Sequence, residues 1–307
     1  MGAGRGPCAE LLVCPVCGER LSEVDARSLR CPRRHTFDLA RQRYVDLLPA
    51  GHGRTGKSGD TAEMLRARRR FLERGRYAAL TDAIVREVVD EAAGWGGADG
   101  SRFTVVDVGS GEGHHIGRIA EALAGLAWSG EPCLFGLDIS KAAVKLAARR
   151  HPGVRFFVND VQHRICLADG CVDVVLDAFA PRNAEEFGRI ARPGGIAVVA
   201  IPTERHLGEL RAVLPLLEIE PGKEARTVER FAPAFELEAS ETVERRVGLA
   251  ADDVLDLLRM TPNYWHLGEA ALERAEALGG MEVTLGFRIL RFRRAGAGSA
   301  VGSGARG

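Results

Sequence analysis

Short apolar runs alternate with amphipathic segments along most of the chain, from residue 103 onward. Between the runs, segments such as SKAAVKLAARRH at 140–151 repeat their apolar residues at the spacing of a helix. Apolar runs joined by helices are typical of strands that are buried on both faces of a parallel sheet. We therefore predict an α/β domain with a doubly wound sheet. The predicted strands lie at 103–108, 133–138, 154–158, 172–177 and 196–201.

Further elements are predicted on both sides of these strands. The segment 60–93 has the pattern of two helices, the first capped by Asp60 or Thr61 and the second beginning near Tyr77. Residues 282–292 predict one more strand, placed at an antiparallel edge of the sheet.

The composition is that of a protein with a substantial core. Apolar residues make up 46% of the chain, and no run reaches the roughly 18 apolar residues of a membrane span. The N-terminus, MGAGRGPCAE, lacks the apolar stretch of a secretory signal peptide. We therefore expect a cytoplasmic location and no membrane contact. The seven cysteines, an odd number spread along the chain, do not have the pattern of a disulfide scaffold.

Charge is unevenly distributed, although the formal net charge is zero. Residues 1–80 contain 16 lysines and arginines against 9 acidic residues, whereas the remainder contains 26 against 33. A positive N-terminal third suits a polyanionic partner. A solvated helix face rich in arginine would give the same count, so charge alone leaves both interpretations open.

Four residues near the N-terminus, Cys14, Cys17, Cys31 and His35, have the spacing of a metal site, C-x2-C-x13-C-x3-H. Three thiolates and one imidazole complete a tetrahedral Zn2+ site and leave no position for a substrate, so the metal is predicted to be structural. The alternative is free or redox-active thiols, and the pairing of two half-sites disfavours it.

These patterns divide the chain into four parts. Residues 1–40 are predicted to form a zinc-binding ribbon, and 41–100 a basic linker with helices. Residues 101–294 are predicted to form the sheet domain, and the Gly/Ala/Ser-rich tail at 295–307 is predicted to be disordered.

The strongest pattern after the metal site is the turn that follows the first strand, VVDVGSGEG at 105–113. Glycines at such a turn allow positive φ and let the backbone approach a ligand closely. A dinucleotide would place phosphate at the following helix N-terminus, where Glu112 would repel it. S-adenosylmethionine carries an ammonium and a sulfonium and no phosphate, so it fits this turn better than NAD does. A tight turn with capping acids and no ligand is the remaining alternative.

Polar residues at the ends of the next strands extend this predicted site. Asp138 ends the second strand, where it can accept hydrogen bonds from ribose hydroxyls, and Asn159 ends the third, near the expected position of an adenine. The cofactor-binding residues predicted from these patterns are Asp107, Gly109, Gly111, Glu112, Gly113, Asp138 and Asn159.

Residues 51–58, GHGRTGKS, match the phosphate-binding pattern G-x-x-x-x-G-K-[ST]. That pattern requires a buried strand directly before the loop, whereas RQRYVDLLPA precedes it here, with Pro49 beside the loop. We interpret the segment as a basic interdomain loop and not as an ATP site.

Several segments together resemble one family, namely CPVC, CPRRHTFDLARQRYVDLLP, DVGSGEG, GLDISKAAVKLAARR and LLRMTPNYW. They resemble the bacterial 23S ribosomal RNA guanine-N1 methyltransferases, which include the tylosin/mycinamicin-type macrolide-resistance enzymes. The resemblance implies a class I (Rossmann-like) S-adenosylmethionine methyltransferase sheet with an N-terminal zinc ribbon. It also implies a homodimer whose cleft takes hairpin 35 of 23S rRNA for methyl transfer to guanine N1.

The resemblance assigns further site residues. Cys14, Cys17, Cys31 and His35 match the family's zinc ligands, and Tyr77, Glu112, Gly113 and His206 match its cofactor contacts. Taken alone, Tyr77 would be an aromatic on a helix face and His206 a polar residue at a helix start. Their predicted roles therefore depend on the resemblance.

Methyl transfer to guanine N1 requires loss of the N1 proton and a base that has left its stack. Asp177, at the end of the fourth strand, is the candidate proton acceptor. The rings of Phe179, Pro181, Tyr264 and Trp265 are candidate walls for the base, although all four could equally be core residues.

Six arginines between 66 and 76 could contact phosphates, but one face of a helix presents only some of them. The predicted RNA-binding residues are Arg33, Arg34, Arg66, Arg69, Arg70 and Trp265. A methyltransferase for a small molecule, with the ribbon as a structural lid, is the alternative function. A non-catalytic adaptor is a third possibility, which the acidic glycine turn and Asp138 disfavour.

Overall fold

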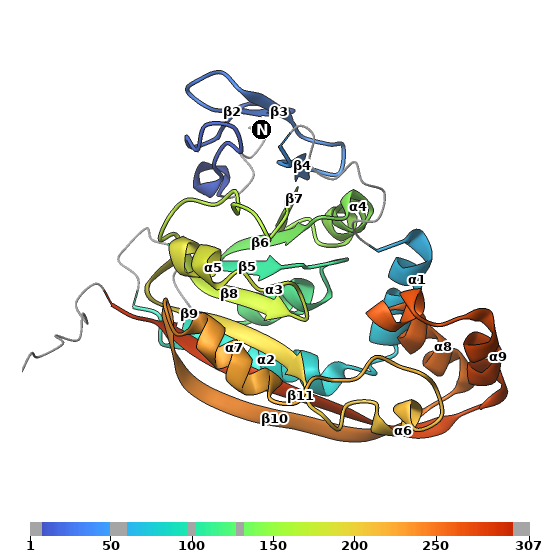
Figure 1. Ribbon diagram of the computed structural model, residues 1–307. Helices are drawn as coiled ribbons and strands as arrows, with labels where there is room; N and C mark the ends of the chain where they lie inside the picture. The colour runs from blue at the N-terminus through green and yellow to red at the C-terminus, as the bar shows by residue number, and fades with distance from the viewer. Residues whose placement is uncertain (1–7, 50–59, 97–101, 127–131, 297–307) are drawn as a thin grey trace, which may run out of the picture.

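An eight-stranded mixed sheet forms the centre of the molecule in the computed structural model, which describes residues 8–49, 60–96, 102–126 and 132–296 (Figure 1). Its strand order is β10-β11-β9-β8-β5-β6-β7-β4. The strands are β4 (Val45–Asp46), β5 (Thr104–Val108), β6 (Cys133–Asp138), β7 (Arg155–Val158), β8 (Val172–Ala178), β9 (Ala191–Pro202), β10 (Phe235–Leu249) and β11 (Met281–Arg294).

All the strands predicted from apolar runs are present, and β5 to β9 pair in parallel as expected. Residues 282–292 form an antiparallel strand, as predicted, but not at the predicted edge of the sheet. β11 is antiparallel, but it lies between β9 and β10, so β10 is the edge strand. β10 was not predicted, because Glu236–Thr242 are all exposed and form no buried apolar run of the kind that marks the other strands.

Helices cover both faces of the sheet. On one face, Leu80 and Ile84 of α2 (Ala78–Ala93) and Ile116 of α3 (His114–Ala124) pack with Val105 of β5, and α4 (Lys141–Arg150) joins this layer. The other face is covered by two helices and by the N-terminal ribbon. These two helices are α5 (Ala184–Ile190) and α7 (Lys223–Phe231).

The N-terminal ribbon is fastened to the sheet domain by backbone hydrogen bonds. Its three antiparallel strands are β1 (Ser22–Asp25), β2 (Ser28–Arg30) and β3 (Thr36–Asp38). Val13 donates to the carbonyl of Cys166 at 3.0 Å, and Ala168 donates to the carbonyl of Leu11 at 2.9 Å. Leu12 between them is fully buried. The ribbon therefore shares the core of the larger domain and does not build one alone.

Two features near the ribbon differ from the sequence prediction. The strand β4 lies in the predicted linker and pairs with β7, so part of that linker belongs to the sheet. Cys8, preceding the short helix η1 (Ala9–Leu11), forms a disulfide with Cys133, where the sequence analysis expected no disulfide framework.

A helical lobe lies beside the sheet (Figure 1). It combines α1 (Ala62–Glu73) with segments that connect β10 to β11, namely α8 (Ala251–Arg259), η2 (Pro262–Trp265) and α9 (Glu269–Ala277). Thr61 caps α1, since its hydroxyl accepts from the backbone N–H of Met64 at 3.2 Å. Arg74 and Arg76 of the α1 segment pair with the buried Asp253 of α8 at 2.8 and 2.6 Å, which joins the two helices.

Among the described residues, no helix is long and apolar enough to cross a bilayer. The phosphate-loop pattern at 51–58 and nearly all of the predicted disordered tail lie outside the described residues.

Candidate cofactor cleft and metal centre

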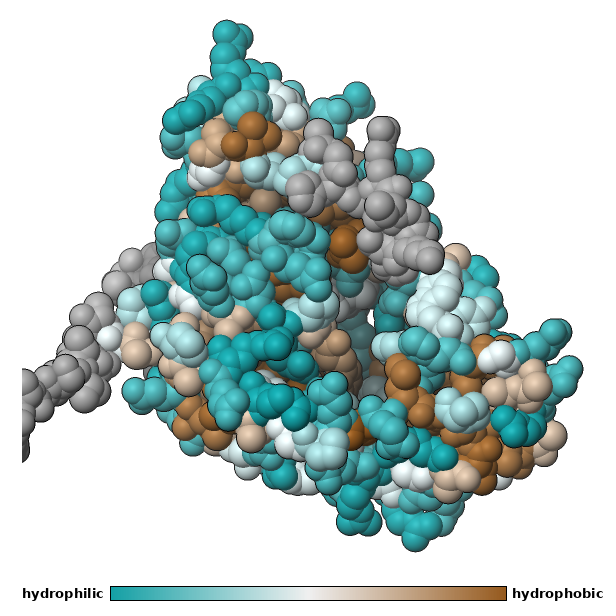
Figure 2. Space-filling view, viewed as in Figure 1, coloured by the Kyte–Doolittle hydropathy of each residue, from teal (hydrophilic) through white to brown (hydrophobic). Residues whose placement is uncertain are grey.

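A cavity of about 1230 Å³ opens between the sheet and the helical lobe. Figure 2 shows the surface hollowed at this place. The cavity lies at the carboxyl ends of β5, β6 and β8. From β5, the strand order continues through β6 and β7 toward one edge of the sheet and through β8 and β9 toward the other, so the order switches direction at this place. Open α/β sheets bind their ligands at such a switch point.

The glycine-rich turn forms one wall of this cavity. Gly109, Gly111 and Gly113 have φ of +69°, +55° and +78°, which L-amino acids with side chains rarely adopt. A β-carbon at Gly109 would also lie 2.5 Å from the β-carbon of Ala180, in the loop after β8. The turn and the loop after β8 therefore touch, and only glycine permits that contact.

Asp138 lies in the cavity and is held by the turn. One carboxylate oxygen accepts from the backbone N–H of Gly111 at 2.9 Å, and the other from Ser140 at 2.8 Å. Burial raises the pKa of Asp138 above its usual value. Asn159 also lines the cavity, but its side-chain oxygen accepts from the N–H of Cys166 at 3.2 Å, so its amide organises the loop that follows β7.

The two other predicted acids have different surroundings. Asp107 is 1% exposed and does not line the cavity, and burial raises its pKa well above the usual value. Glu112 lines the cavity, but its carboxylate accepts two hydrogen bonds from Arg69, at 2.8 and 3.0 Å. Of the three acids, only Asp138 lies in the cavity without an arginine salt bridge.

Tyr77 and His206 come together although 129 positions separate them in the sequence. Both line the cavity and pack around Phe287 of β11, with ring-centre distances of 5.0 Å for Tyr77 and 4.8 Å for His206. The N–H of Gly286 donates to Nδ1 of His206 at 3.3 Å. Burial lowers the pKa of His206 to about 3, so its ring is neutral at physiological pH.

The loop after β8 carries an aromatic ring into the cavity. Phe179 has φ of +68° and is 42% exposed, an unusual combination for a bulky residue and one often found at functional sites. Asp177, just before it, is fully buried and does not line the cavity. It accepts from the N–H of Ala180 at 3.0 Å, and burial raises its pKa to about 7.

The predicted RNA-binding residues divide into two groups. Arg33, Arg34 and Arg66 are exposed, and Trp265 is 60% exposed while lining the cavity. The side chains of Arg69 and Arg70 instead bond to carboxylates of this chain. Arg69 binds Glu112, and Nε of Arg70 donates to Asp256 at 3.0 Å.

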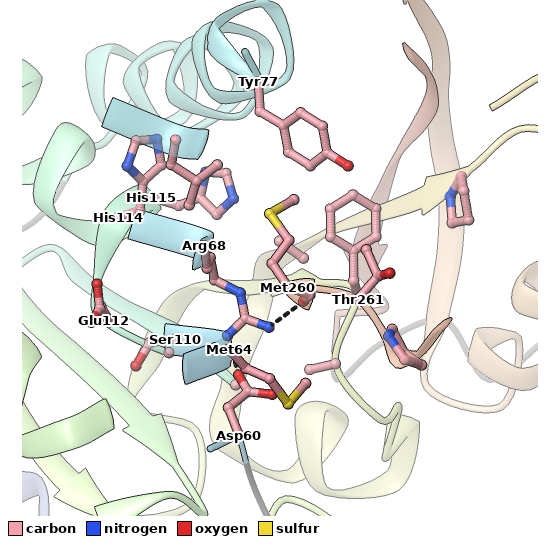
Figure 3. Close-up of a pocket in the computed structure, with 18 of the residues that line it drawn as sticks. Asp60, Met64, Arg68, Tyr77, Ser110, Glu112, His114, His115, Met260 and Thr261 are labelled. Carbon is pink, nitrogen blue, oxygen red and sulfur yellow. Dashed lines mark hydrogen bonds and ion pairs between the residues drawn. The ribbon is translucent and has the colours of Figure 1, made fainter. Parts of the chain in front are cut away.

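Sequence reasoning missed the place of Arg68. Figure 3 shows its guanidinium inside the cavity, bonded to Asp60 and to the backbone oxygen of Met260. Helical periodicity could not distinguish Arg68 from the other arginines of α1. The packing of α1 on α8 decides which face of the helix meets the cavity. His114 and His115, directly after the turn, also line the cavity, and the sequence analysis gave them no role.

The ribbon brings four predicted ligands together. One ligand atom from each of Cys14, Cys17, Cys31 and His35 lies within 4.8 Å of all the others. The Sγ atoms of Cys17 and Cys31 are 3.6 Å apart, and Nδ1 of His35 is 3.4 Å from Cys31 Sγ. A tetrahedral zinc ion separates its ligand atoms by roughly 3.5–3.8 Å, given Zn–S and Zn–N bonds of about 2.3 and 2.0 Å. The site therefore fits structural zinc.

Two family models match the chain. The model described as "RlmA, N-terminal", a zinc-ribbon model, matches residues 12–55. The model described as "Methyltransferase domain" matches residues 99–220.

Named relatives match over nearly the full length. A 23S rRNA (guanine(748)-N(1))-methyltransferase of Streptomyces fradiae is 41% identical, covering 89% of this chain and 93% of the relative. A Micromonospora griseorubida protein, provisionally named a 23S rRNA (guanine-N(1)-)-methyltransferase, is 41% identical, covering 92% and 97%. YxjB of Bacillus subtilis (strain 168), named in the same provisional way, is 30% identical and covers 90% and 95%.

Proposed function

The chain belongs to the bacterial 23S rRNA (guanine-N1) methyltransferase family, and on that premise we propose that it methylates N1 of a guanine in hairpin 35 of 23S rRNA. The observation that carries this proposal is the 41% identity across the ribbon, the linker helices and the methyltransferase domain together. The methyl donor is S-adenosylmethionine, the cofactor of methyltransferase domains of this kind.

The residues of the cleft suit this donor. The glycine-rich turn offers backbone, Asp138 offers a carboxylate for ribose hydroxyls, and Tyr77 with His206 forms an uncharged aromatic wall. The bound donor supplies a methyl group activated by its sulfonium. The carboxylates of the cleft would repel a pyrophosphate, so these residues disfavour binding of NAD or ATP.

The target base must leave its stack to enter the cleft, and Phe179 and Trp265 are placed to contact it. Holding N1 in line with the methyl–sulfur bond supplies much of the rate. Asp177 remains our candidate acceptor for the N1 proton. Its side chain lies under the loop that carries Phe179, so this role requires that loop to move when RNA binds.

We propose separate roles for the parts of the chain that the sequence predicted. The zinc ribbon at 1–40 and the basic linker at 41–100 position the RNA, and 101–294 performs the transfer, in a homodimer whose cleft takes the hairpin. The modification would protect the ribosome of this organism from a tylosin- or mycinamicin-type macrolide. Light scattering tests the dimer, and macrolide sensitivity of cells lacking the gene tests the protection.

Primer extension tests the central reaction, because a methyl group on guanine N1 blocks base pairing and stops reverse transcriptase. Purified protein with methyl donor and naked 23S rRNA is expected to produce one stop within hairpin 35. A transcript with that guanine replaced is the control and should show none. Transfer of labelled methyl to a small-molecule extract, with none to rRNA, would favour the small-molecule alternative instead.

A further inference from the structure

One guanidinium group lies inside the cleft, against the glycine-rich turn. A β-carbon built on Gly111 would lie 3.5 Å from Nη1 of Arg68, so the arginine lies in van der Waals reach of the turn. Its side chain is 27% exposed and comes from α1, outside the methyltransferase domain proper. Figure 3 shows it between the turn at Ser110 and the end of α8 at Met260.

This place needs a positive charge once the donor is bound. Besides its sulfonium and ammonium, S-adenosylmethionine carries a carboxylate on its methionine end. Three carboxylates near the turn, those of Asp60, Glu112 and Asp138, line the cavity. An anionic ligand group among these carboxylates would be repelled unless a cation contacted it directly.

Two other arginines beside the turn, Arg69 and Arg150, already pair with carboxylates of this chain. Arg69 makes two hydrogen bonds to the buried Glu112, and Arg150 is shared between Glu73 at 2.6 Å and Glu112 at 3.8 Å. Arg68 instead bonds to Asp60, which lies two residues before α1 and whose side chain is 25% exposed. The guanidinium of Arg68 therefore already binds a carboxylate that is partly open to solvent. A carboxylate of a ligand can replace that of Asp60.

We propose that Arg68 binds the carboxylate at the methionine end of the methyl donor, in place of Asp60. The proposal rests on the proposed function for the identity of the donor. It makes the linker helix part of the cofactor site.

A structural consequence follows from the second bond of Arg68. Nη2 donates to the backbone oxygen of Met260 at 3.0 Å, and Met260 directly precedes a segment whose Thr261, Pro262, Asn263 and Trp265 line the cavity. A carboxylate held by Arg68 therefore joins the glycine turn, α1 and the end of α8. Donor binding would stabilise the wall that receives the target base.

Calorimetry on the full, zinc-loaded chain tests the proposal with three probes. S-adenosylhomocysteine has the carboxylate and the ammonium. Decarboxylated S-adenosylmethionine keeps the ammonium and the sulfonium but lacks the carboxylate, and 5′-methylthioadenosine lacks both the carboxylate and the ammonium. Arg68→Gln should weaken S-adenosylhomocysteine binding about 10- to 100-fold, as expected for loss of a charged hydrogen-bond pair. It should change the other two affinities less than about threefold, within the small effects of lost surface interactions.

Arg68→Lys keeps the positive charge but loses the planar pair of N–H donors of the guanidinium. It should therefore lower the affinity for S-adenosylhomocysteine alone, by less than Arg68→Gln does. Arg86→Gln is the matched control, because Arg86 is an exposed arginine on the neighbouring α2 that does not line the cavity.

The outcomes separate this inference from the proposed function. Equal losses for all three probes would show that Arg68 supports the lobe and not the carboxylate, and an unchanged S-adenosylhomocysteine affinity would also overturn the inference. If the unmodified chain bound none of the probes, the proposed function itself would fail, and this inference with it.

Discussion

Burial decides which carboxylates near the strand ends carry charge. Asp138 is the last residue of β6, and Asp107 and Asp177 are the next-to-last residues of β5 and β8, so their sequence contexts are alike. Asp138 meets two backbone N–H groups at the cavity, whereas one oxygen of Asp177 has no hydrogen-bond partner among the described residues. Desolvation then outweighs the single hydrogen bond from Ala180 and favours the protonated form of Asp177.

Asp177→Asn tests this at the level of stability. The folded-state pKa of Asp177, about 7, lies above the ordinary value of 3.8, so the folded state binds more protons between these values. The stability of the unmodified chain should therefore fall as pH rises from about 4 to about 7, and the variant should lack this component. The variant should gain about 3 kcal/mol relative to the unmodified chain between pH 5 and pH 8.

Thermal unfolding followed by circular dichroism at both pH values measures this difference. A pH-independent difference in melting temperature would contradict it. Methyl transfer by the same variant is a separate readout, and unchanged turnover would remove Asp177 as proton acceptor.

At the scale of elements, the packing of α1 on α8 builds the lobe that closes the cleft. Two buried aspartates of α8, Asp253 and Asp256, meet arginines of the α1 segment. These carboxylates are almost fully buried, so they depend on those partners. The arginine-rich face that suggested RNA binding is therefore in part an intramolecular interface.

Asp253→Asn should loosen this interface. The exchange removes the carboxylate partner of Arg76 and leaves Arg74 with the more distant Asp256 at 3.5 Å, and we expect a loss of about 1–3 kcal/mol in stability. Hydrogen exchange should rise in α1 and α8 and stay unchanged in β5 and β8. Asp252→Asn is the matched control, because Asp252 is the exposed neighbour on the same helix. Equal exchange in both variants would show that the salt bridges do not hold the lobe.

The metal site is expected to stabilise the fold of the ribbon. The ribbon has three short strands, so zinc should supply most of the free energy that orders residues 12–40. Elemental analysis is expected to find one zinc per chain. Cys31→Ser should abolish zinc binding and raise hydrogen exchange in β1 to β3, while S-adenosylhomocysteine still binds.

Cys171→Ser is the control, since Cys171 lies outside the ligand cluster. Full zinc content in the Cys31→Ser variant would exclude Cys31 as a ligand.

At the scale of the whole molecule, the positive N-terminal third lies in the ribbon and linker. Arg33 and Arg34 are exposed there, and Arg33 makes only a distant pair with Glu19 at 4.0 Å. Binding to a hairpin RNA should weaken linearly with the logarithm of salt concentration. The double variant Arg33→Gln, Arg34→Gln should reduce that slope by about 1–2.

Filter binding at several salt concentrations measures the slope. Arg226→Gln is the control, because Arg226 is an exposed arginine on α7 that pairs with Glu220. A slope unchanged by the double variant would place the RNA elsewhere on the molecule.

The sequence alone determined the parts of this protein that depend on local pattern. The parallel strands follow from short apolar runs, and the glycine turn follows from backbone positions that only glycine tolerates. The four zinc ligands follow from spacing, since a short segment can bring such close half-sites together in few ways. Membership of the family was also visible in the sequence, because its motifs are contiguous.

Only the tertiary structure decided what depends on contacts between distant segments. It placed β10 outside β11, buried Asp107 and Asp177, and turned Arg68 into the cleft while Arg69 and Arg70 met carboxylates of the chain itself. It also brought Tyr77 to His206 around Phe287. The physical reason is that the charge and exposure of a side chain depend on its neighbours in space, and residues adjacent on a helix can meet different neighbours.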